Sequence, residues 1–174
     1  MRPAARRDPA ASEGQLKPDS RPDAVAVVVL RGPSAGSGQA REDAQVLLLR
    51  RSSGAFAGAW TFVMGGVEDG ERATDAARRE LSEETGLSLE ALFTAGELDA
   101  FYDPVRDSIV HVPFFVAHAG DGDVALEEDV HDEHCWVSFR QAEEMLEFAS
   151  HRRVLDEIHR AFVARFPAPW RKIR

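Results

Sequence analysis

The chain has 174 residues, 44% of them hydrophobic, and a formal net charge of −9, which fits one globular domain with short tails. The excess of acidic side chains argues against a nucleic-acid-binding protein, since such a protein usually carries a basic face. The single cysteine excludes an internal disulfide and favours a reducing, cytoplasmic compartment, and no apolar run approaches the roughly 20 residues that span a membrane.

The chain opens with residues 1–22, which contain four prolines and no hydrophobic period, and we expect a mobile tail there. Runs rich in aliphatic and β-branched residues then predict strands. These runs are 23–31, 45–51, 60–63, 97–102, 109–118 and 135–139. The first two strands are expected to be buried on both faces, and residues 120–134 are expected to form an acidic loop.

Three helices are predicted. The clearest is Thr74–Thr85, with its first residue as N-cap and Gly86 as the left-handed residue that ends it. Ser138 and Gln141 have capping-box spacing, which predicts a helix that runs through residue 148. The third helix is expected over 151–166, where apolar residues recur on one face.

The first of these helices carries three glutamates on one side. At about 100° per residue, Glu80, Glu83 and Glu84 share an arc of roughly 100°. Like charges at this spacing destabilise a helix by roughly 0.2–0.5 kcal/mol per pair, so a counter-charge is expected. A hard divalent cation such as Mg²⁺ would supply it, whereas a solvated acidic face is the alternative explanation for the three glutamates alone.

The residues around these glutamates form a longer pattern. Five residues separate Gly65 from Glu71, and seven more separate Glu71 from the run Arg79–Leu87, RELSEETGL. The pattern resembles the Nudix box in every defined position. One departure is Met64, because many members of the family carry proline there.

The resemblance implies a fold and an activity. The expected fold is α/β (α+β), a single domain over 23–166 with a mixed sheet between helices, flanked by tails at 1–22 and 167–174. Nudix hydrolases use divalent metal to hydrolyse a diphosphate linked to another group, often a nucleoside. The implied cofactor is therefore Mg²⁺, with Mn²⁺ as a substitute, and the implied partner is a small nucleotide or related diphosphate. No membrane and no stable nucleic-acid partner are expected, and a homodimer is left open.

The resemblance also implies roles for the residues of the box. Glu80, Glu83 and Glu84 would hold the metal together with the backbone carbonyl of Gly65. Gly66 would let the backbone approach the phosphates closely. The catalytic set would be completed by a supporting pair, Glu71 and Arg79.

Substrate contacts outside the box are predicted from position. Arg50 and Arg51 end a strand near the expected cleft, where one of them could contact phosphate or both could be solvated. Phe62 is a candidate to stack on a base, with core packing as the alternative.

The acidic loop before the last strand supplies a further candidate group. His131, with Trp136 five residues later, resembles an element of members that cleave nucleoside triphosphates or dinucleoside polyphosphates. Those members often carry glutamate before the histidine, where this chain has Val130. An acid role there would pass to Asp129 or Glu133. The first candidates for the proton acceptor are Glu80 and Glu83 of the box, and the two loop acids follow them.

Three functions are compatible with the sequence. The first is pyrophosphohydrolysis of a nucleoside triphosphate-type substrate. The second is hydrolysis of a dinucleoside polyphosphate, ADP-ribose or a nucleotide-sugar, and the third is a non-catalytic nucleotide-binding module of the same fold. Non-catalytic modules commonly lose box glutamates, and this chain keeps all of them.

Overall fold

The chain folds into seven strands and three α-helices in a computed structural model that describes residues 20–32, 44–54, 56–120, 122–127 and 129–174. Most of the predicted tail and of the 32–44 connection lie outside these residues. The strands are β1 (Ala24–Arg31), β2 (Gln45–Arg51), β3 (Trp60–Thr61), β4 (Val63–Gly66), β5 (Leu89–Asp103), β6 (Ser108–Ala119) and β7 (His131–Ser138). The helices are α1 (Ala73–Thr85), α2 (Phe139–Met145) and α3 (Ala149–Ile158), followed by a π-helical turn, η2 (His159–Val163), and a 3₁₀ turn, η3 (Pro169–Arg171).

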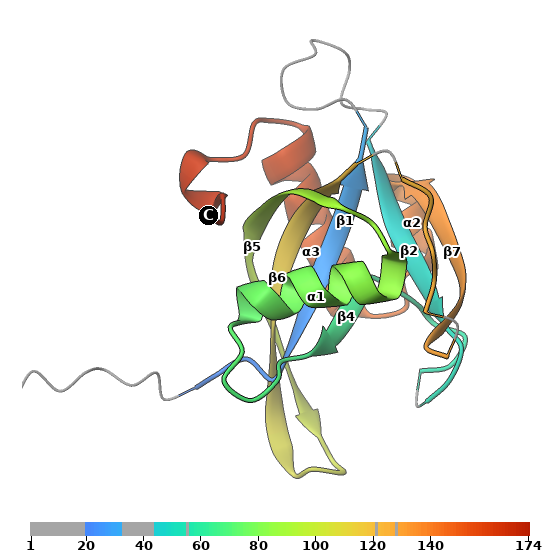
Figure 1. The fold of residues 1–174 in the computed structure, drawn as a ribbon, viewed down its shortest axis with the longest axis vertical. Coiled ribbons are helices and arrows are strands. Elements are labelled where there is room, and N and C mark those ends of the chain that lie inside the picture. Colours follow the sequence, from blue (N-terminus) through green and yellow to red (C-terminus); the bar gives the residue numbers. More distant parts are fainter. Residues whose placement is uncertain (1–19, 33–43, 55, 121, 128) are drawn as a thin grey trace, which may run out of the picture.

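The strands form one mixed sheet in the order β3-β2-β1-β6-β5, with β4 paired to β1 and β7 paired to β2. β1 and β6 run parallel, and the other pairs are antiparallel. Figure 1 shows α1 lying across one face of the sheet, with α2 and α3 on the other. The expected mixed sheet between helices is therefore confirmed.

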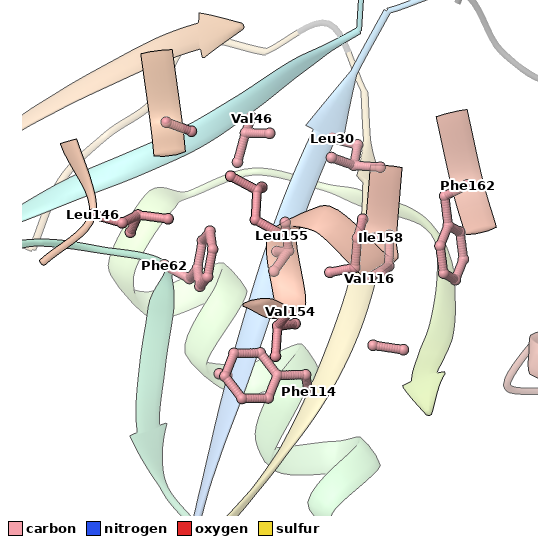
Figure 2. Packing of buried hydrophobic residues seen from close by; sticks show 14 of the residues in the cluster. Leu30, Val46, Phe62, Phe114, Val116, Leu146, Val154, Leu155, Ile158 and Phe162 are labelled. Carbon is pink, nitrogen blue, oxygen red and sulfur yellow. The ribbon is translucent and has the colours of Figure 1, made fainter. Parts of the chain in front are cut away.

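β1 is buried on both faces, as predicted. Its alternate residues Ala26, Val28 and Leu30 join one core cluster, and the residues between them join a second cluster beneath α1. Figure 2 shows Leu155 and Ile158 of α3 packed over the sheet in the first cluster. Because side chains alternate along a strand, a continuous apolar run can face both helical layers at once.

α1 ends where the sequence predicts but begins differently. Gly86 has φ 65° and its N–H donates to the Ser82 carbonyl, which confirms the left-handed end. The predicted cap at Thr74 is wrong: the helix begins at Ala73, and the preceding Arg72 makes no side-chain capping hydrogen bond. The buried face of α1 includes Glu80 and Glu84, so two carboxylates lie against the sheet.

Two strands are longer than the sequence predicts. β5 starts at Leu89 instead of residue 97, and its pairing with β6 shifts register between Thr94 and Leu98. β7 starts at His131 inside the predicted acidic loop, because this polar segment pairs with the buried strand β2. Strand propensity depends on such partners, so polar residues 131–134 give no local signal.

The C-terminal helices are shorter than predicted. The capping box at Ser138 is confirmed, but α2 ends at Met145 and α3 ends at Ile158 before the π-helical turn. The last residues lie along β5, where the Ile173 N–H donates to the Leu92 carbonyl. Within the part of the chain that the structure describes, no helix is long and apolar enough to cross a membrane.

Candidate active site

The segment that carries the Nudix pattern is held by a strand and a helix. β4 pairs with β1, which places Gly65 opposite Val25, and α1 follows after a short turn. A Cβ atom on Gly65 would overlap the carboxylate of Glu80, whereas one on Gly66 would meet nothing within 4 Å. Glycine at position 65 therefore lets a helix glutamate reach the strand backbone.

Arg79 and Glu71 form the supporting pair that was predicted. The Nε atom of Arg79 donates to Oε1 of Glu71 at 3.0 Å, and Nη2 donates to Oε2 at 3.0 Å. The Glu68 N–H also donates to Glu71. These bonds lower the pKa of the Glu71 carboxyl, chiefly through Arg79, and Glu71 raises the pKa of Arg79.

The same guanidinium reaches two of the clustered glutamates. Nη1 of Arg79 donates to Glu80 at 2.7 Å and to Glu83 at 3.0 Å, and Nη2 donates to the Gly66 carbonyl at 2.9 Å. Arg79 thus ties the turn after β4 to the acidic face of α1. It also supplies part of the counter-charge that the three glutamates require.

Glu84 is the most deeply buried carboxyl of the cluster. Its side chain is 3% exposed, and its Oε2 accepts a hydrogen bond from the Met64 N–H at 3.2 Å. Burial raises the pKa of Glu84 to about 8, against the opposing effect of that N–H, and the charge of Glu80 adds to the rise. Burial likewise raises the pKa of Glu80, while Arg79 opposes it.

His131 lies beside Glu84, a contact that the sequence did not indicate. Nδ1 of His131 is 3.9 Å from Oε1 of Glu84, and the histidine side chain is 1% exposed. Burial, followed by the charge of Arg51, lowers the pKa of His131 to about 4. Neither ring nitrogen has a hydrogen-bond partner among the described residues. The histidine comes next to α1 because β7 extends as far as residue 131 and pairs there with Arg51 of β2.

The two arginines at the end of β2 have different surroundings. Nε of Arg50 bonds Asp132 at 2.8 Å, and Nη1 bonds Glu133 at 2.8 Å. Arg51 makes no ion pair with any residue that the structure describes, and its charge lowers the pKa of Glu84. Of the two, Arg51 is the side chain left free for a ligand near the acidic cluster.

Two other predicted contacts lie away from the cluster. Phe62 has no exposed surface and packs edge-on against Phe114, on the face of the sheet opposite α1. This corrects its prediction as a base-stacking residue, because a ring enclosed in the core has no face for a ligand. Asp129 is exposed, and its carbonyl accepts a hydrogen bond from Ser52.

The acidic cluster suits a hard cation in its chemistry. Its donors are carboxylates and the Gly65 backbone, which are the oxygen ligands that Mg²⁺ prefers. Glu84 is buried, and in the described ranges it forms no ion pair with a Lys or Arg side chain. Burying its unpaired negative charge costs free energy, and a bound cation would lower that cost. In the structure as described, no three His, Cys, Asp or Glu side chains converge as metal ligands. Arg79 bridges Glu80 and Glu83 instead.

The comparison with protein families matches the profile of the NUDIX domain over residues 20–158. The chain belongs to the NUDIX domain family. The matched span contains the whole pattern from Gly65 to Leu87 and the strands that position it.

The chain is also similar to individual known proteins. An octanoyltransferase of Myxococcus xanthus is 34% identical over 146 residues, which is 79% of this chain and 36% of that protein. An oxidized purine nucleoside triphosphate hydrolase of Mus musculus is 43% identical over 54 residues, 31% of this chain and 35% of that protein. The chain thus spans about a third of the length of these curated relatives. A solved NUDIX hydrolase of Listeria monocytogenes has a TM-score of 0.65 and 25% identity, covering 82% of this chain and 94% of its own.

Proposed function

We propose that this NUDIX domain hydrolyses a diphosphate linkage in a nucleoside triphosphate-type substrate, using a divalent cation, Mg²⁺ or Mn²⁺. The observation that carries the proposal is the set of three glutamates on α1, with Glu80 against the Gly65 backbone, Glu84 on the Met64 N–H, and both of these carboxyls buried. The mouse relative, whose name describes hydrolysis of oxidized purine nucleoside triphosphates, supports this class of substrate.

The residues of the cluster have distinct tasks in this proposal. Glu80, Glu83, Glu84 and the Gly65 carbonyl hold the cation, which when bound neutralises diphosphate oxygens and lowers the pKa of a bound water. Arg79 stays anchored on Glu71 and fixes the turn against α1. The supporting pair therefore keeps the ligands in place without touching the substrate.

The substrate contacts are inferred from which charged side chains near the cluster are not already held in ion pairs. We assign the phosphate contact to Arg51, since Arg50 is occupied by Asp132 and Glu133. Glu80 and Glu83 of the box stay the first candidates for the proton acceptor, and Asp129 and Glu133 the second; Glu133 is paired with Arg50, as Glu80 and Glu83 are with Arg79. The remaining expectations stay predictions: a cytoplasmic location, no stable nucleic-acid binding, and tails at 1–22 and 167–174. A homodimer is left open.

The test is a panel of nucleoside triphosphates, dinucleoside polyphosphates and nucleotide-sugars with Mg²⁺, with the products separated by chromatography. We expect turnover of triphosphates by the wild type. Glu83→Gln should lower kcat at least 100-fold, because it removes the negative charge of a metal ligand and keeps the shape of the side chain. Glu143→Gln, on the exposed face of α2, is the matched control. Nucleotide binding without turnover by the wild-type protein would instead identify a binding module.

A further inference from the structure

A buried histidine of β7 lies beside Glu84 and has no assigned task. Nδ1 of His131 lies 3.9 Å from Oε1 of Glu84, and neither side chain is more than 3% exposed. Both nitrogens of the ring are enclosed and lack a hydrogen-bond partner among the described residues. Buried polar groups in proteins are almost always hydrogen-bonded. Oε1 of Glu84 is an acceptor beside this ring, but the 3.9 Å separation is too long for a hydrogen bond.

The other oxygen of Glu84 is already supported. Oε2 accepts the Met64 N–H at 3.2 Å, which ties the carboxylate to β4. A carboxylate has about four acceptor positions, so one support on each oxygen would still leave positions for a cation. A hydrogen bond from His131 to Oε1 requires an approach of about 1 Å, from 3.9 Å to the usual N–H···O distance.

We propose that His131 is a positioning residue for Glu84, whose Nδ1–H donates to Oε1 and holds the carboxylate in the orientation that binds the cation. The inference rests on the proposed function, because it assigns a task to a neighbour of a proposed metal ligand. A carboxylate that faces Nδ1 favours the tautomer with hydrogen on that nitrogen. Hydrogen-bonded partners of this kind typically change metal affinity 10- to 100-fold when removed.

Three substitutions at one position separate this role from simple packing. His131→Asn places an amide N–H near the position of Nδ1, His131→Gln places it near Nε2, and His131→Leu removes the donor. Mn²⁺ affinity, measured by electron paramagnetic resonance without substrate, is the readout. We expect the Asn variant to bind within about threefold of the wild type, and the Gln and Leu variants to bind 10- to 100-fold more weakly.

A second buried histidine supplies the matched control. His151 on α3 is 3% exposed, and its Nδ1 also lacks a partner among the described residues, but its ring packs against Phe62 and Phe114 on the opposite face of the sheet. His151→Leu should leave Mn²⁺ affinity unchanged even if it lowers the thermal midpoint. Should His131→Leu fail to fold, the Asn and Gln variants still decide the question.

The outcomes separate the two proposals. A wild-type protein that binds no Mn²⁺ overturns the proposed function. A wild-type protein that binds Mn²⁺ while all three His131 variants bind it equally well overturns the positioning role alone, and so does a Gln variant that binds better than the Asn variant. Nitrogen-15 NMR of the wild-type ring gives an independent check, since the proposal requires the hydrogen on Nδ1.

Discussion

Arg79 holds both carboxylate oxygens of Glu71, through Nε and Nη2, each at 3.0 Å. This fork fixes the plane of the guanidinium, so that its remaining nitrogen, Nη1, points to Glu80 and Glu83. The turn between β4 and α1 is thereby linked to the acidic face of the helix by one side chain. Its geometry can be tested by a substitution that keeps the charge.

Arg79→Lys should lower kcat/KM by about 10- to 100-fold. A lysine ammonium keeps the positive charge but cannot form the planar two-bond contact with Glu71, so Glu80 and Glu83 lose their fixed partner. Steady-state kinetics with Mg²⁺ measure the effect. Arg78→Lys is the matched control, because Arg78 makes no ion pair with a residue that the structure describes. An Arg79→Lys enzyme with wild-type kcat/KM would show that the fork is dispensable.

Gly65→Ala should reduce Mn²⁺ affinity and kcat by at least tenfold. The added methyl group would overlap the carboxylate of Glu80, and this carboxylate must then leave the backbone of β4. Gly66→Ala, one residue away, meets nothing within 4 Å and should keep the Mn²⁺ affinity of the wild type. Metal titration and kinetics of the two purified variants make the comparison, and equal behaviour of both would contradict the close approach.

The sequence predicted most of this site because its signals are local. The spacing from Gly65 to Glu84 lies on one strand, one turn and one helix, and the helical period alone brings the three glutamates together. The pairing of Arg79 with Glu71 was implied by the resemblance to the Nudix box, whereas its two-bond geometry was not predicted. The left-handed end of α1 was predicted because Gly86 is a residue that adopts positive φ without strain.

The features that the sequence did not reveal depend on contacts between distant segments. His131 reaches Glu84 only because β7 pairs with β2 as far as Arg51, and a polar run gives no local sign of such pairing. Phe62 could not be assigned to the core or to a ligand from its type alone. Arg50 and Arg51 are adjacent in sequence, and only the partners of Arg50 on β7 show which guanidinium is free.

Glu84→Gln should stabilise the protein at pH 8 in the absence of metal while it abolishes activity. The pKa of Glu84 is raised from 4.5 to about 8, so its contribution to folding is complete below pH 4.5 and is lost as the pH rises through 8. The glutamine side chain is neutral at every pH, so the variant does not lose this stability as the pH rises. Thermal midpoints of wild type and variant in EDTA, measured from pH 5 to 9, should diverge in favour of the variant as the pH rises.

Mg²⁺ should make the thermal midpoint of the wild type at pH 8 higher than that of Glu84→Gln. The cation binds the charged carboxylate, so it should raise the thermal midpoint of the wild type more at pH 8 than at pH 6. The variant should gain much less. If Mg²⁺ shifted both midpoints equally at pH 8, Glu84 would not be one of its ligands.

His151→Phe should flatten the dependence of stability on acid pH. The ring of His151 packs among Phe62, Phe114 and Phe148, and burial lowers its pKa from 6.5 to about 4, against the opposing charge of Asp99. The unfolded chain therefore takes up a proton more readily than the native protein between pH 6.5 and pH 4, and stability falls as the pH falls through this window. The shift corresponds to about 3 kcal/mol of unfolding free energy at most. Urea unfolding at several pH values should show a smaller loss of unfolding free energy in acid for His151→Phe than for the wild type, and equal losses would contradict the burial effect.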